Sequence, residues 1–276
     1  MVQASLLQDR SVVALSGADT RDFLQGIISN DMDRCTPGNA IYAGLLTPQG
    51  KILFDFFVVE REGAFLLDCA KDRAADLIKR LTLYRLRAKV EIAIRPDLIV
   101  AALWNGDAMA LPPLAFADPR LAALGARLIG TRGEIGDAIA GVPAGDYAAH
   151  RLLLGVPDSA DLPSDTVLAL DAGFEELNGV NFKKGCYVGQ EVTARMKHRA
   201  TARKRFVIVE SEDALPPAGT PIEAQDRELG IVASGKGKRA LALARLDRLA
   251  DAEIAGAAIT AGGHKIVLRK PAWLAP

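Results

Sequence analysis

The sequence predicts an α+β protein whose C-terminal part is rich in short strands. Two apolar runs, Ala40–Leu46 and Ile52–Val59, flank a Thr-Pro-Gln-Gly-Lys segment, and its proline and glycine favour a tight turn, so the pair predicts a β-hairpin. Apolar residues recur at helical spacing in residues 16–29 and 72–83. From Phe206 onward, short β-like segments alternate with Pro-Pro and Gly-rich turns, which is typical of a small barrel or sandwich.

The other elements follow from the same patterns. The residue types and turn signals predict a helix that ends at Gly155 and several more strands: Asp146–Leu154 is the helix, and Ser11–Leu15, Ala64–Asp68, Lys89–Ile94, Leu98–Leu103 and Arg127–Gly130 are the strands. Asp55 interrupts the second hairpin strand. We expect it on a solvated face, with a ligand channel as the alternative.

Composition excludes several classes of protein. Half of the 276 residues are apolar, and 34 Lys plus Arg balance 34 Asp plus Glu, so the whole chain shows no bias toward nucleic acid or membrane. Three widely spaced cysteines form neither a disulfide framework nor the paired spacing of a zinc site, so no metal site is expected. No signal peptide or membrane-spanning run is evident. These features predict a cytoplasmic protein without a membrane partner.

One segment carries most of the chemical interest, because it places a cysteine directly after two lysines. It reads Lys183-Lys184-Gly185-Cys186-Tyr187-Val188-Gly189-Gln190-Glu191. The thiolate of cysteine is a strong nucleophile and a soft metal ligand, and adjacent cations favour it. The two glycines are expected to take positive φ. An amide and a carboxylate follow. The alternative is a turn in which the cysteine has no chemical role.

The motif resembles the signature of the YgfZ family, folate-binding proteins related to the T-protein (aminomethyltransferase) of the glycine cleavage system. Mitochondrial relatives of this family assist iron–sulfur cluster maturation. Residues 17–26, 45–52 and 84–89 also resemble the superfamily, and the resemblance runs from about Val12 to the C-terminus. It implies a T-protein-like folate-binding body of two intertwined subdomains with mostly antiparallel sheets, residues 1–199, and a C-terminal β-barrel domain, residues 200–276.

The resemblance also implies a cofactor, tetrahydrofolate or a one-carbon derivative. T-proteins carry an asparagine at a strand end and an aspartate on the following helix, and these align with Cys69 and Asp76. An ordinary exposed acid is the alternative for Asp76. Arg85, Arg87 and Lys89 alternate, so an extended chain would put them on one face, either to hold the folate glutamate tail or as a solvated basic edge.

One position departs from the T-protein pattern. Where T-proteins have a glutamate that binds the pterin ring, this chain has Leu153, which cannot form those hydrogen bonds. Glu175 and Glu176 are candidate substitutes.

A basic segment, Arg195–Arg205, follows the motif, and six of its eleven residues are Lys or Arg. It could hold a phosphate backbone or a polyglutamate tail, or be only a solvated surface. No aromatic residue interleaves it, so base stacking gains no support. His198 could pair with Cys186 or lie on the surface of a basic strand.

Three functions compete. The first is a tetrahydrofolate-binding accessory protein for iron–sulfur cluster assembly or repair, with assembly proteins or cluster-dependent enzymes as partners. Cys186 would be the reactive thiol, and Lys184 would promote its thiolate; since a cluster normally takes four thiolates, one cysteine would act transiently. The second is a one-carbon transferase that uses Asp76. The third is a tRNA-modification-associated protein with weak tRNA contact through Arg195–Arg205. Only the second is necessarily an enzyme.

Overall fold

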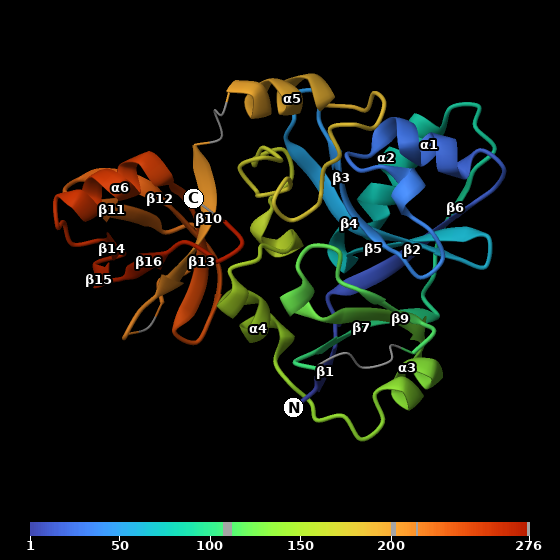
Figure 1. The fold of residues 1–276 in the computed structure, drawn as a ribbon, viewed down its shortest axis with the longest axis horizontal. Coiled ribbons are helices and arrows are strands. Elements are labelled where there is room, and N and C mark those ends of the chain that lie inside the picture. Colours follow the sequence, from blue (N-terminus) through green and yellow to red (C-terminus); the bar gives the residue numbers. More distant parts are fainter. Residues whose placement is uncertain (107–111, 200–202, 214, 275–276) are drawn as a thin grey trace.

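The computed structural model describes residues 1–276 apart from 107–111, 200–202, 214 and 275–276. Its strands form sheets of five, four and seven strands, which Figure 1 shows as three lobes. All strand pairings recorded within these sheets are antiparallel. The prediction of an α+β fold with mostly antiparallel sheets is therefore confirmed.

The five-stranded sheet has the order β3-β4-β5-β2-β6 and contains the predicted hairpin. Its strands are β2 (Arg10–Ser16), β3 (Ile41–Leu46), β4 (Ile52–Arg61), β5 (Ala64–Ala70) and β6 (Glu91–Ile94). Successive side chains of a strand point to opposite faces. One face, with Leu15 and Phe56, packs against helices α1 (Thr20–Ile27) and α2 (Ala74–Arg85). The other, with Tyr42 and Phe57, faces the middle of the molecule.

The four-stranded sheet has the order β1-β7-β9-β8. Its strands are β1 (Gln3–Leu6), β7 (Leu98–Trp104), β8 (Ala115–Ala117) and β9 (Ala126–Thr131). Helix α3 (Arg132–Ala138) follows, and a capping box between Thr131 and Glu134 fixes its start. Because β1 precedes the five-stranded sheet in sequence while β7 follows it, the chain crosses between the two lobes more than once.

A long connection leads from the second lobe to the motif. Helix α4 (Tyr147–Leu154) begins after Asp146, whose carboxylate accepts a hydrogen bond from the Ala149 backbone, and ends at Gly155 with φ of 70°. A 3-10 turn (Ser159–Asp161) and a loop lead to helix α5 (Gln190–Arg199). The other 3-10 turns are Met32–Arg34, Lys71–Arg73 and Ala122–Leu124.

The seven-stranded sheet forms the C-terminal lobe, in the order β15-β14-β11-β12-β13-β10-β16. Its elements are β10 (Lys204–Glu210), β11 (Pro221–Ala224), β12 (Arg227–Lys236), β13 (Arg239–Arg245), α6 (Leu246–Ile254), β14 (Thr260–Ala261), β15 (His264–Lys265) and β16 (Val267–Arg269). The two edge strands of the sheet are neighbours in sequence, so the sheet curls into a near-closed barrel (Figure 1). Val207 and Val232 fill its interior, while Phe206 and Leu241 join the core of the body.

The sequence patterns missed helices α3, α5 and α6. Helix α5 shows why, because Thr193 is its one buried residue among those described, so it has no apolar stripe. The alternative that placed His198 on a basic strand was wrong in its element, because His198 lies in α5 and β10 begins only at Lys204. Residues 200–202, where the proposed domain boundary falls, lie outside the described residues, so that boundary stays a prediction. In the described part of the chain, no helix has the length and apolar character needed to cross a bilayer.

Candidate functional site

The motif forms a loop that leads into the first turn of α5. Buried and exposed residues alternate along it: Lys184 and Tyr187 are buried, whereas Lys183, Gly185 and Cys186 are exposed. The loop is thus fastened through some of its side chains and presents the others to solvent.

Lys184 is the main fastening point. Its ammonium group donates hydrogen bonds to the backbone carbonyls of Gln25 at 2.6 Å, Ile28 at 2.6 Å and Asn30 at 3.0 Å. It also lies 5.1 Å from the ring centroid of Tyr187. Burial lowers the pKa of Lys184 to about 8, and the Asp31 carboxylate opposes this shift. The carbonyls at the end of α1 are otherwise without helical partners, so Lys184 acts as the cap of that helix.

Hydrogen bonds connect the residues before the motif to the same turn after α1. Ser29 donates a hydrogen bond to the Gly179 carbonyl at 2.6 Å, and the Asn30 amide donates to the Asn178 carbonyl at 2.7 Å. The Asn181 side chain accepts a hydrogen bond from the Lys183 backbone at 2.7 Å. The first two bonds hold the chain that precedes Lys184 against the turn after α1, and the third fixes the backbone that leads into Lys184.

The motif glycines differ from each other. Gly189 has a φ of 85°, and a Cβ atom there would lie 2.5 Å from the Thr47 carbonyl oxygen in the hairpin turn. The motif therefore docks closely on the turn between β3 and β4 through Gly189. Gly185 was also expected to need positive φ. That expectation was wrong, because Gly185 is not among the residues with positive φ and a Cβ atom there would meet no heavy atom within 4 Å.

Cys186 is the exposed member of the three cysteines. Cys35 and Cys69 are buried, and burial raises the pKa of Cys35 to about 11 and that of Cys69 to about 12. Thiols of this kind remain protonated and inert near neutral pH. Cys186 is consequently the thiol that can meet a partner molecule.

Cys186 has no metal-binding companions on its own chain within the described residues, since no group of three or more His, Cys, Asp or Glu side chains is placed to hold a metal ion. Lys184, expected to promote the thiolate, directs its ammonium group to the carbonyls described above. Its role toward the thiol stays a prediction, and its observed contacts are structural.

The remaining motif and basic residues lie on or near α5. Gln190 is half-buried and Glu191 is exposed, forming an ion pair with Arg195. Lys197 forms an ion pair with Glu175. His198 is exposed near the end of the helix. Several of the basic side chains are therefore neutralised by neighbouring acids, and the predicted tRNA contact gains no support from an uninterrupted basic surface.

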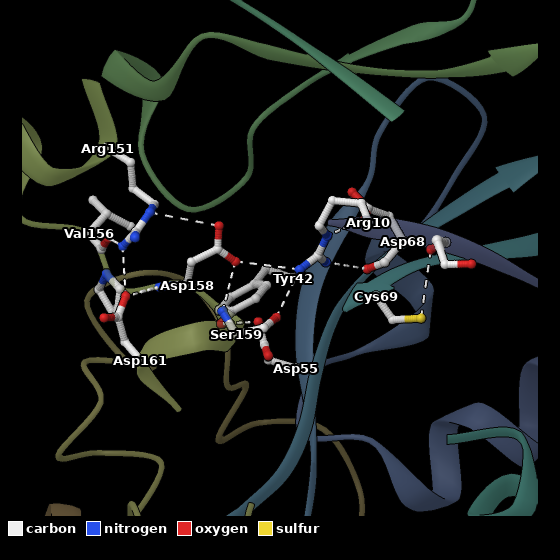
Figure 2. Close-up of polar contacts among 12 residues, drawn as sticks. Arg10, Tyr42, Asp55, Asp68, Cys69, Arg151, Val156, Asp158, Ser159 and Asp161 are labelled. Carbon is white, nitrogen blue, oxygen red and sulfur yellow. Dashed lines mark hydrogen bonds and ion pairs between the residues drawn. The ribbon is translucent and has the colours of Figure 1, made fainter. Parts of the chain in front are cut away.

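The predicted folate-binding residues do not gather at one place. Cys69 is buried in β5, where its thiol donates to the Ser11 carbonyl at 3.7 Å (Figure 2). Asp76 is exposed on α2 and lies 3.8 Å from Lys79. The shared strand face expected for Arg85, Arg87 and Lys89 was wrong, because Arg85 is the last residue of α2 and donates to the Val90 carbonyl. The helix extends further than the sequence pattern predicted.

The proposed substitutes for the pterin glutamate are engaged elsewhere. Glu175 pairs with Lys197, and Glu176 lies 3.5 Å from Arg205. Leu153 is 53% exposed on α4. The pterin roles of Glu175 and Glu176 stay predictions.

The middle of the molecule contains a feature that the sequence analysis missed: buried arginines paired with aspartates, of which Asp158 is half-buried and the others are buried. We call it the central charge cluster, and it consists of Arg10, Asp68, Asp118, Arg120, Arg127, Arg151, Asp158 and Asp161. Asp68 lies 2.6 Å from Arg10 and 2.7 Å from Arg127, which joins the two sheets of the body. Arg151 of α4 pairs with Asp161 at 2.8 Å (Figure 2). Charges placed inside apolar strands, such as Asp68 and Arg127, were the available signal.

Asp55 belongs beside this cluster. It is 6% exposed and accepts a hydrogen bond from the Tyr42 hydroxyl at 3.1 Å (Figure 2). Burial raises the pKa of Asp55, although Arg10 opposes the shift. The expectation of a solvated face was therefore wrong, because β4 is covered on both sides.

A cavity of about 670 Å³ opens next to Arg10. We call it the Arg10 cavity, and it lies between the Lys71–Arg73 turn and the Ser159–Asp161 turn. Arg10 is held from behind by Asp68 and Ser159, whereas Lys71 is exposed at the rim. Its volume lies in the range of small-molecule sites. Its lining mixes the cations Lys71 and Arg73 with the carboxylates Asp9 and Asp72, so it is these two cations, and not the charge of the cavity as a whole, that fit the carboxylate tail of a folate. Cys69 is adjacent in sequence to Ala70, which lines the cavity; Asp76, Arg85, Arg87 and Glu175 are not among its described lining residues.

Comparisons with known proteins give a consistent picture. Residues 203–276 match the family described as the CAF17 C-terminal beta-barrel domain. The human iron–sulfur cluster assembly factor IBA57, mitochondrial, is 35% identical over 273 residues, which cover 86% of this chain and 76% of the human protein. The homologue from Mycosarcoma maydis is 36% identical over 219 residues, covering 72% of this chain and 54% of that protein.

A solved structure shows the fold. Glycine cleavage system aminomethyltransferase T from Bartonella henselae superposes with a TM-score of 0.74 at 17% identity, covering 98% of this chain and 84% of that chain. The architecture is therefore T-protein-like, with a near-closed C-terminal barrel domain, as the resemblance implied.

The relatives also correct one expectation. Those from human, Mycosarcoma maydis and Neurospora crassa are named as mitochondrial proteins. This contradicts the cytoplasmic location expected from composition and from the lack of an evident signal peptide. Overall composition and sparse cysteines are common to proteins of several reducing compartments, so they do not determine the location.

Proposed function

The chain belongs to the family of the iron–sulfur cluster assembly factor IBA57, and on that premise we propose that it assists iron–sulfur cluster assembly or repair through Cys186. The observation that supports this role is the placement of one exposed thiol on a loop that is fastened before it by Lys184 and after it by Gly189. A fixed loop lowers the entropy lost when the thiol meets its target.

Cys186 would act as one ligand among several. Iron–sulfur clusters normally take four thiolates, so a partner protein or small thiol would supply the others while Cys186 holds the cargo transiently. The exposed Lys183 beside it would favour the thiolate. Iron–sulfur assembly proteins or cluster-dependent enzymes are the partners that this chemistry requires.

We also propose that the Arg10 cavity binds a reduced folate, which when bound supplies a one-carbon carrier. The motif's resemblance to folate-binding proteins motivates the ligand, and the size of the cavity and its cations Lys71 and Arg73 support the place. Lys71 and Arg73 would bind the glutamate carboxylates. Arg73 already lies over the Phe54 ring, 4.8 Å from its centroid, so its guanidinium is preoriented.

A complementation experiment tests the thiol. In cells without their own copy, Cys186→Ser should abolish the recovery of cluster-dependent enzyme activity, while the protein keeps its melting temperature. Cys35→Ala is the matched control, because that thiol is buried and inaccessible. Recovery by Cys186→Ser equal to that of the natural chain would refute the proposal.

A binding experiment separates the two candidate folate surfaces. Calorimetric titration with tetrahydrofolate should show one site whose affinity falls roughly three- to tenfold in Lys71→Ala, as expected when one charge contact is lost. Arg87→Ala is the comparison variant and should leave the affinity unchanged. The opposite pattern would return the glutamate tail to the segment after α2, and the absence of any titration would remove the folate.

A further inference from the structure

A second cavity lies between the barrel and the body. It has a volume of about 560 Å³, and we call it the seam cavity. Its barrel wall includes Phe206, Ile231 and Leu243, and its body wall includes Pro163 and Val167. Small-molecule sites of this size are common where two lobes meet. Neither Cys186 nor the basic residues of the Arg10 cavity are among its described lining residues.

The barrel wall of the seam cavity is an apolar row across three strands. In the sheet register, Leu243 of β13 lies opposite both Phe206 of β10 and Ile231 of β12. Cross-strand partners have side chains on the same face, so the three form one continuous surface. Phe206 is fully buried against the body, whereas Ile231 is 46% exposed. The row therefore starts under the body and ends at the mouth of the cavity.

The seam cavity also has a cation at its rim. Lys204 lines it and lies two residues before Phe206, on the same face of β10. Among the described residues, no carboxylate forms an ion pair with the Lys204 ammonium group, in contrast to Arg205, whose guanidinium lies 3.5 Å from Glu176.

The Asp171 carboxylate, 3.9 Å from Arg205, also attracts Lys204, so the lysine is partly compensated. Asp161, a carboxylate in the lining, is itself paired with Arg151. An apolar wall with one cation at its rim complements a molecule with an apolar body and a single anionic end.

We propose that the seam cavity binds a small amphipathic organic anion, such as an aliphatic or aromatic carboxylate. The apolar body would cover Ile231 and Leu243, and the anionic end would meet Lys204. Burial of the half-exposed isoleucine supplies most of the binding free energy, and the lysine selects for charge. This site is separate from the thiol chemistry and does not depend on it.

Titration of the full chain with decanoate and with decanol tests the inference. Decanoate should bind at one saturable site. Ile231→Glu, which places a carboxylate in the mouth, should weaken binding by at least roughly tenfold. Ile254→Glu is the matched control: Ile254 is 88% exposed in the same lobe, outside the lining of the cavity, and its replacement should have no effect.

Lys204→Gln sharpens the test, because it should weaken decanoate roughly two- to fivefold and leave decanol unchanged. The seam cavity and the Arg10 cavity share the lining residues Ala160 and Pro163, so a variant must tell them apart. Lys71 lines only the Arg10 cavity, and Lys71→Ala should therefore leave decanoate binding intact. Lack of saturable decanoate binding overturns the proposal, as does equal weakening by the two glutamate variants. Loss of binding in Lys71→Ala would also overturn it by assigning the anion to the Arg10 cavity.

Discussion

The motif loop and the central charge cluster both bury cations, but the buried cations have different hydrogen-bond and ion-pair partners in the two regions. In the cluster each arginine faces a carboxylate: Arg10 and Arg127 share Asp68, Arg120 pairs with Asp118, and Arg151 with Asp161. Lys184 in the motif loop meets neutral backbone carbonyls instead. An ion pair with a carboxylate connects two side chains. The carbonyl partners of Lys184 instead attach the motif loop to the end of α1.

The difference separates the structural part of the molecule from the part that presents chemistry. Cluster residues come from both body sheets, the loop after β8, α4 and the adjoining 3-10 turn, and their charges compensate one another in the interior. The motif loop buries Lys184, Tyr187 and Gly189 and leaves Cys186 exposed between them. Changes in the cluster should therefore cost the most stability, and changes in the loop should cost less and also move the thiol.

The largest effect is expected for Asp68→Ala. Asp68 is fully buried, and its removal leaves Arg10 and Arg127 without their shared carboxylate. Breaking a buried ion pair from one side costs about 3–5 kcal/mol. Urea unfolding should show this loss in the free energy of unfolding. Asp97→Asn, in the exposed pair with Arg95, is the control and should cause no measurable change. Equal stability of the two variants would contradict the structural role of the cluster.

A smaller loss is expected for Lys184→Met, which keeps the apolar stem and removes the ammonium group. Three carbonyls lose their donor, which should reduce the free energy of unfolding by about 2–3 kcal/mol at pH 7. Hydrogen exchange should also accelerate in residues 28–30 and 178–184. Lys183→Met is a closely matched control, because that neighbouring lysine is exposed. If both variants behave alike, Lys184 does not fasten the loop.

The two motif glycines provide a third comparison. Gly189→Ala places a Cβ atom 2.5 Å from the Thr47 carbonyl oxygen at a φ of 85°, and should cost about 1–3 kcal/mol. Gly185→Ala meets open space and should be tolerated. Thermal unfolding measures both, and thiol labelling of Cys186 reports whether the loop has moved. A neutral Gly189→Ala would mean that the hairpin turn does not hold the motif.

Local patterns predicted the elements that have local causes. The hairpin with its Pro-Gly turn, the α1 stripe containing Phe23 and Leu24, and the α4 stop at Gly155 are each determined by neighbouring residues. Helix α5 was not predicted, because it is polar and its position depends on contacts between Gly189 and the hairpin turn. Arg85 was misplaced because α2 continues into a segment with alternating charges.

The candidate site was only partly accessible to such reasoning. The motif could be identified from its own residues, and the exposure of Cys186 agrees with a reactive thiol. The partners of Lys184 could not, because Gln25, Ile28 and Asn30 lie more than 150 positions earlier and contribute backbone oxygens. Likewise Asp55 looked solvated because nothing near it in sequence indicates that Tyr42 and Arg10 surround it.

The smallest expected effect is the pH dependence of the free energy of unfolding that Asp158 of the cluster contributes. Burial alone would raise the pKa of Asp158, but Arg10 and Arg151, at 3.4 and 3.8 Å, together with other arginines, hold it well below its ordinary value of 3.8. A carboxyl whose pKa is depressed in the folded state stabilises the fold above its unfolded pKa, and loses that contribution as the pH falls through the folded pKa.

Natural protein should therefore exceed Asp158→Asn in free energy of unfolding by about 1–2 kcal/mol at pH 6, and the difference should shrink below about pH 4. Unfolding curves recorded at pH 6 and at a series of values below about pH 4 measure the change. Asp226→Asn, in the exposed turn between β11 and β12, should show no such pH-dependent difference. A gap that stayed constant into acid would show that the arginines around Asp158 stabilise its neutral form equally well. Ionisation of Asp158 would then contribute no stability to the cluster.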